Sequence, residues 1–157
     1  MFVAIVAIAT CVVVCVGLHL TILRLLWRST SAGPGPRRNI HIALLVLGCI
    51  VAHIIEIGVF SIGLFAVAEY DGDTRIVLEG RQHNNLDLWY FSACYFTSLG
   101  AERNPPSAGL RVFTACEAVV GLILITWTAS FLFLLMQEVW APKDRPTQIP
   151  PRELATN

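Results

Sequence analysis

The sequence predicts an all-helical integral membrane protein, and two observations carry this prediction. Its 157 residues are 55% hydrophobic and only 14% charged, with a mean hydropathy of +0.66, whereas soluble domains carry about 25% charged residues. Crossing a bilayer takes about 20 mostly apolar residues at about 1.5 Å of rise each. Three stretches reach that length, residues 2–26, 40–68 and 112–136. A fourth, 86–99, is too short to span and predicts a re-entrant, interfacial or buried helix.

The segments between and after these stretches set the domain organisation. The first stretch lacks a preceding basic residue and a small-residue cleavage site, so we expect a retained helix rather than a cleaved signal peptide. Residues 29–38, "STSAGPGPRR", contain glycines, prolines and arginines that predict a short loop. Residues 141–157 are polar and rich in proline, which predicts a disordered cytoplasmic tail. Residues 1–140 are therefore expected to form one transmembrane domain.

The distribution of charge predicts the orientation in the cell membrane. Basic residues in short loops favour the cytoplasmic side. Those between the first two spans and in the tail are Arg24, Arg28, Arg37, Arg38, Lys143, Arg145 and Arg152. Residues 69–109 instead carry six acidic residues against three arginines. We therefore expect a multi-pass protein with its N-terminus outside and its C-terminus in the cytoplasm.

The short apolar segment predicts a helix over residues 87–97 that enters the membrane from outside. Asp87 suits its N-cap, because a carboxylate accepts hydrogen bonds from the free N–H groups of a first turn. The opposite end then presents carbonyl groups with partial negative charge at membrane depth, which favours cations. The chain must return through residues 97–103. Non-helical backbone at that depth needs surrounding protein or water, so we expect several chains around an axis.

A resemblance to a known family is carried by residues 88–135, which read "LWYFSACYFTSLGAERNPPSAGLRVFTACEAVVGLILITWTASFLFLL". This stretch resembles the pore module of the potassium-channel superfamily, in particular small bacterial proteins of the two-transmembrane ion-channel family. There an aromatic pore helix precedes Thr-Thr-Leu-Gly-Tyr-Gly-Asp and a pore-lining helix. The His-x-x-Glu-Ile pattern at residues 53–57 is similar as well. The resemblance implies a homotetramer with a re-entrant pore helix and a filter-like loop.

The filter of that family maps onto residues 97–103. The resemblance gives Trp89, Tyr90 and Phe91 the place of the pore-helix aromatics, and Thr97, Ser98, Leu99 and Gly100 the place of the filter's Thr-Thr-Leu-Gly. Ala101 then replaces the filter Tyr, Glu102 the second Gly and Arg103 the Asp. In the family, four such loops stack backbone carbonyls that replace the hydration shell of K⁺.

The three replacements predict poor K⁺ selectivity. The glycine positions of such a filter need positive φ, which costs other L-residues about 1–2 kcal/mol each. Glu102 opposes that geometry in every chain, and Ala101 removes the ring that would pack behind the filter. Glu102 could instead form a ring of carboxylates that admits cations such as K⁺ and Na⁺. Alternatively, it pairs with Arg103 or is simply solvated.

Ionisable residues inside the predicted spans need partners or a function, because an unpaired charge there is costly. His53 and Glu56 share one face of the second span, and Glu56 is expected to pair with His53 or with the pore helix. Glu117 lies near the outer end of the third span, where it could hydrogen-bond the loop backbone. A buried polar network without contact to ions is the alternative for both glutamates. In the third span, Gly121 would permit a bend.

A rival interpretation starts from the first span, where Cys11, Cys15 and His19 recur every four residues and form one stripe. Such a stripe could ligate a metal, or hold a haem together with His53. Free cysteines in apolar spans more often act as small hydrophobic residues. The sequence shows no phosphate-binding loop, nucleophile–base pair or basic nucleic-acid patch, so neither an enzyme nor a nucleic-acid-binding protein is expected, and no cofactor is called for.

The sequence therefore predicts a tetrameric, potassium-channel-like cation channel with the non-standard filter TSLGAER. The alternative is a channel-shaped membrane protein that does not conduct and has a structural or regulatory role.

Overall fold

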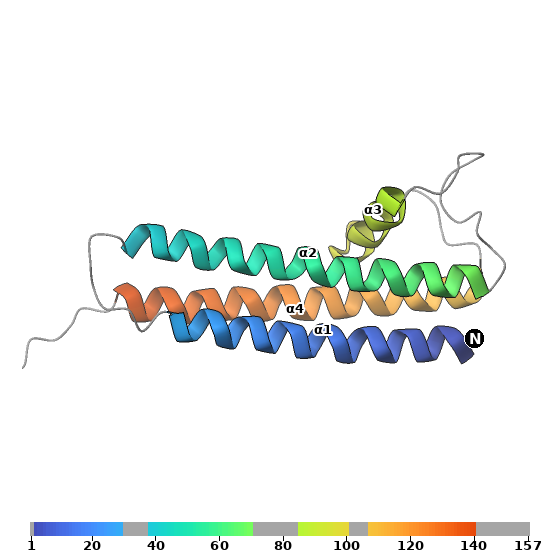
Figure 1. Ribbon diagram of the computed structural model, residues 1–157, viewed down its shortest axis with the longest axis horizontal. Coiled ribbons are helices and arrows are strands. Elements are labelled where there is room, and N and C mark those ends of the chain that lie inside the picture. The colour runs from blue at the N-terminus through green and yellow to red at the C-terminus, as the bar shows by residue number, and fades with distance from the viewer. Residues whose placement is uncertain (1, 30–37, 71–84, 101–106, 141–157) are drawn as a thin grey trace, which may run out of the picture.

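The computed structural model describes residues 2–29, 38–70, 85–100 and 107–140. This part of the chain is helical apart from short non-helical ends, and no strand occurs in it (Figure 1). The helices are α1 (Phe2–Ser29), α2 (Arg38–Tyr70), α3 (Asn85–Phe96) and α4 (Ala108–Trp140).

Three of these helices, α1, α2 and α4, are long and apolar enough to cross a membrane. Within the described residues, the prediction of an all-helical protein with three helices of membrane-spanning length is thus confirmed, with each helix a few residues longer than the apolar stretch that predicted it. The extra residues at the ends are mostly polar, so the apolar stretches stop before the helices do. The three helices lie side by side and alternate in direction (Figure 1). The start of α1, the end of α2 and the start of α4 therefore share one end of the bundle.

The outer surface of this bundle is apolar. Only 22–28% of the residues in the most apolar window of each long helix are buried. Large side chains such as Val13, Ile62 and Phe133 are exposed. An apolar surface of this extent on a soluble monomer would be unusual, and it suits contact with lipid or with other membrane helices.

The inner surface contains the cysteine–histidine stripe of α1. Cys11, Cys15 and His19 are all buried, so the spacing correctly predicted one shared face. Around it, the buried rings of Phe60 from α2 and Phe113 from α4 meet edge to face, with centroids 6.0 Å apart, a favourable geometry for aromatic pairs. These contacts join the three long helices into one core.

The short helix α3 is inclined to the bundle and packs against α2 and α4 (Figure 1). Its bounds, Asn85–Phe96, are close to the predicted 87–97. Because the helix begins earlier than predicted, Asp87 lies in its first turn rather than at the N-cap. A carboxylate in the first turn still interacts favourably with the helix dipole.

Candidate functional site

The C-terminal end of α3 lies against the middle of α4. Gly121, near the middle of the candidate span Ala108–Glu138, packs so closely on the Phe96 backbone that a Cβ atom at Gly121 would overlap the Phe96 carbonyl oxygen. Phe96 is itself 1% exposed. The glycine thus allows α3 to reach half-way along the bundle, a role for Gly121 other than the bend expected from the sequence.

The backbone turns sharply where α3 ends. Ser98 and Gly100 have positive φ values of 58° and 76°, whereas the intervening Leu99 does not. Three N–H groups close the turn, donating to helix carbonyls: Thr97 to Ala93 (3.1 Å), Ser98 to Tyr95 (2.9 Å) and Gly100 to Cys94 (2.9 Å). A left-handed residue just past the last turn commonly ends a helix, although glycine or asparagine usually holds that place. Ser98 adopts it at a steric cost.

The segment that follows α3 is uncovered by its own chain. Thr97, Ser98, Leu99 and Gly100 are all exposed, and Leu99 is 78% exposed. The structure therefore leaves non-helical backbone open at the depth where α3 meets the middle of α4. The remaining predicted filter residues, Ala101, Glu102 and Arg103, lie outside the described residues.

Glu117 of α4 holds the middle of α3 rather than the turn after it. Its Oε1 contacts the Ser92 hydroxyl of α3, and Ser92 also contacts the backbone carbonyl of Ile57 in α2 at 3.2 Å. A hydroxyl has one hydrogen and a backbone carbonyl only accepts. Ser92 can therefore share its one hydrogen between the two acceptors, or Glu117 can carry a proton and donate it to Ser92, which makes each contact a full hydrogen bond. All three groups are buried, and Ser92 and Glu117 are 0% exposed, where a neutral acid costs far less than a carboxylate.

Glu56 of α2 bridges two histidines. Its Oε1 lies 2.8 Å from His19 Nδ1 of α1, and its Oε2 lies 2.8 Å from His53 Nδ1. Of the two partners expected for Glu56, His53 is the one observed, and His19 is an additional partner. His19 and Glu56 are 0% exposed, while the His53 side chain is 19% exposed.

Thr128 of α4 joins the same two histidines on their other side. Its hydroxyl lies 3.1 Å from His53 Nε2 and 3.4 Å from His19 Nε2. Protein atoms thus engage both nitrogens of each ring. His19, His53 and Glu56 also offer ligand atoms within 4.8 Å of one another, a set that could hold a metal ion. The centroids of the two histidine rings lie 5.6 Å apart.

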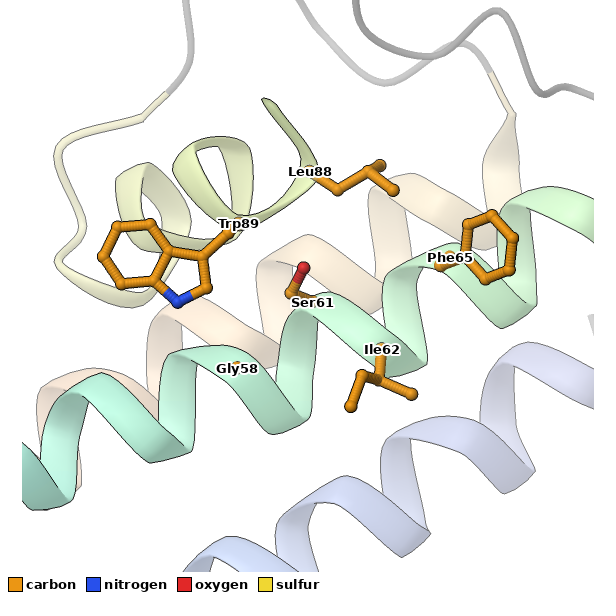
Figure 2. A pocket seen from close by; sticks show the side chains of 6 residues that line it. All are labelled: Gly58, Ser61, Ile62, Phe65, Leu88 and Trp89. Carbon is orange, nitrogen blue, oxygen red and sulfur yellow. The ribbon is translucent and has the colours of Figure 1, made fainter. Parts of the chain in front are cut away.

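A pocket of about 330 Å³ lies between α2 and α3. Figure 2 shows Leu88 and Trp89 of α3 extending over α2, with Ser61 beneath them. The other lining residues are Gly58, Ile62 and Phe65 of α2. The lining is mainly apolar, and it contains none of the predicted filter or intramembrane polar residues.

The polar residues fall into two groups joined by α3. Glu117 contacts Ser92 in the middle of α3. The second group, Glu56 with its two histidines and Thr128, contacts the end of α3, because the centroids of the His53 and Phe96 rings lie 5.9 Å apart. Sequence reasoning missed Ser92 and Thr128, because a single hydroxyl in an apolar helix usually bonds to its own backbone.

Comparisons with protein-family models, with curated proteins and with solved structures gave no match.

Proposed function

We propose that the chain forms a tetrameric channel for monovalent cations, in which residues 97–103 line the narrow part of the pore. The observation that carries the proposal is the exposed, non-helical backbone of Thr97–Gly100 half-way along a bundle of membrane-length helices. In a bilayer, such backbone is stable only when other protein or a water-filled passage surrounds it. Copies of the same chain around an axis would supply both.

The conformation of this segment supports a cation pathway. φ changes sign along the segment, being positive at Ser98 and Gly100 and not at Thr97 or Leu99. The N–H groups of Thr97, Ser98 and Gly100 all donate back to carbonyls of α3, so they do not face a passing ion. The C-terminal end of the α3 dipole carries partial negative charge at the same place, which favours cations over anions.

The number of subunits and the selectivity rest on the resemblance to potassium channels. The four-fold arrangement is that of the family. Thr97, Ser98 and Gly100 match its filter, whereas Ala101 and Glu102 replace the Tyr and the second Gly that a K⁺-selective filter uses. We therefore propose passage of K⁺ and Na⁺ with little discrimination, and an outward-facing filter, with the N-terminus outside and the C-terminus in the cytoplasm.

Cation flux into liposomes tests the proposal. Purified protein should dissipate a K⁺ or Na⁺ gradient, and Gly100→Ala should reduce the flux strongly, because a Cβ at φ 76° is strained in every subunit. Gly17→Ala is the matched control, since a Cβ at Gly17 meets no atom within 4 Å, and it should conduct like the native protein. Absence of flux from native tetramers would contradict the proposal and favour the non-conducting alternative.

A further inference from the structure

Four side chains from the three long helices form a closed ring of contacts. Glu56 Oε1 meets His19 Nδ1 and Glu56 Oε2 meets His53 Nδ1, both at 2.8 Å. Thr128 Oγ1 then meets His19 Nε2 at 3.4 Å and His53 Nε2 at 3.1 Å. Each of the four contacts joins two polar atoms, so each needs one hydrogen to be a hydrogen bond.

The number of hydrogens that the ring holds depends on whether all four contacts are hydrogen bonds. With Glu56 ionised and both histidines neutral, the two Nδ1–H groups fill two contacts and the Thr128 hydroxyl fills a third. The fourth contact then brings an Nε2 lone pair against an oxygen lone pair. One additional proton, on either histidine, completes the ring.

The additional proton has more than one place within the ring. In one order, Glu56 is a carboxylate and one histidine is an imidazolium. In another, Glu56 is a neutral acid that donates to Nδ1 of one histidine, whose Nε2–H donates to Thr128, while both rings are neutral. Both orders fill four contacts, and both have zero net charge. We propose that Glu56, His19, His53 and Thr128 form a proton-binding site that holds one exchangeable proton between the three long helices.

Charge and distance both favour a proton over a metal ion. A bound proton makes the site neutral, whereas a divalent ion with one carboxylate and two neutral imidazoles leaves a net positive charge in apolar surroundings, which is costly. Ligand atoms around a tetrahedral zinc ion at about 2.0–2.1 Å lie about 3.3 Å apart. The two contacts of 2.8 Å between Glu56 and the histidines are instead hydrogen-bond distances.

Side chains from three helices surround the ring. The Cys15 thiol of α1 donates to the backbone carbonyl oxygen of Glu56 at 3.8 Å. The Trp127 ring of α4 lies beside His19, with centroids 5.5 Å apart, and the Phe96 ring of α3 lies beside His53, with centroids 5.9 Å apart. Among the described residues, the other buried carboxyl is that of Glu117, which lies about 16 Å along α4 from Thr128 at about 1.5 Å per residue. The ring is therefore the local proton acceptor. The His53 side chain, 19% exposed, is the most accessible of the four and is the proposed entry point for a proton.

The folded ring holds one additional proton, whereas the two histidines of the unfolded chain hold two protons well below about pH 6.5 and none well above it. Stability should therefore be greatest near that pH. It falls at lower pH, where the unfolded chain binds the second proton, and falls as rising pH removes the proton from the folded ring. Loss of the proton leaves a net negative charge and one unmade bond between helices. Because His53 also packs on Phe96, this change occurs beside the end of α3.

The substitution Glu56→Gln separates this site from a fixed structural network. A glutamine at this position donates to one Nδ1 and accepts from the other, so two neutral histidines and Thr128 complete the ring with no additional proton. We expect Glu56→Gln to fold and to melt at a temperature nearly independent of pH between about 7 and about 9, where the histidines of the unfolded chain are neutral as well. The native protein should lose stability across that range. A pH jump of the native protein should also release one more proton per chain than the variant, measured with an indicator dye in weakly buffered detergent.

His41→Gln is the matched control, because His41 lies on α2 outside the ring, and its melting should follow that of the native protein. Equal proton release by the native protein and Glu56→Gln would overturn the proposal, as would failure of Glu56→Gln to fold. If the purified protein contains one transition-metal ion per chain and His19→Gln does not, the four residues form a metal site and the proposed proton site is wrong. These measurements do not depend on conduction, so they can fail or succeed separately from the proposed channel function.

Discussion

Gly121 of α4 and Phe96 of α3 are in direct backbone contact, with no room for a side chain at residue 121. This contact fixes how deeply α3 enters the bundle. It also places the exposed turn after α3 at the middle of a membrane-length helix. Adding one methyl group at residue 121 should therefore displace the segment that lines the proposed pore.

We expect Gly121→Ala to displace α3 and to destabilise the fold. The new methyl group meets backbone, which cannot rotate away as a side chain can, and overpacking of this kind costs about 1–3 kcal/mol. The melting temperature in detergent measures it. Gly17→Ala should be neutral or slightly stabilising, since alanine favours helix by up to about 1 kcal/mol and the site is open. Equal melting temperatures for the two variants would show that the contact does not hold α3.

The contact between Glu117 and Ser92 tests the protonation of a buried acid. If Glu117 donates as a neutral acid, Glu117→Gln retains a donor of similar shape and should cost less than about 1 kcal/mol. Glu117→Ala leaves the Ser92 oxygen without that donor and opens a cavity, at about 1–3 kcal/mol. Thermal unfolding compares the two, with Glu138→Gln at an exposed position as the control. Glutamine as damaging as alanine would argue for a carboxylate.

Membrane topology can be tested without knowledge of conduction. The positive-inside bias leads us to expect labelling from outside at a tag inserted near Gly72, and cytoplasmic location of a reporter fused after Asn157. Intact and permeabilised cells distinguish the two sides. The reverse pattern would place the turn after α3 on the cytoplasmic side and would contradict the proposed orientation.

Assembly is tested by crosslinking and by native mass spectrometry in mild detergent. Four chains are expected, because residues 97–100 are exposed on a single chain and the resemblance is to tetrameric channels. A stable monomer, or a complex that ends at another number, would remove the potassium-channel arrangement from the proposal.

Apolar length alone predicted the three long helices, because a membrane helix must satisfy its own backbone and bury a continuous apolar stretch. The short helix α3 was also predictable, since its apolar run ends too soon to span. The i, i+4 spacing of Cys11, Cys15 and His19 correctly indicated one shared face, which the structure shows to be buried.

The partners across helices were not predictable. Thr126 and Ser130 bond to carbonyls of their own helix, whereas Thr128 between them bonds to two histidines. Nothing in the local sequence separates these hydroxyls, because the difference depends on which helix face meets α1 and α2. Gly121 was interpretable as a bend until the position of Phe96 was known.

The reversal potential of purified protein in planar bilayers, with K⁺ on one side and Na⁺ on the other, tests the central claim most directly. We expect measurable current with a reversal potential near zero, because Ala101 and Glu102 stand where a K⁺-selective filter has Tyr and Gly. The double substitution Ala101→Tyr with Glu102→Gly restores the family's residues and should shift the potential toward K⁺ selectivity. Strong K⁺ selectivity of the native protein, equal to that of the double variant, would contradict the account, as would absence of current from intact tetramers.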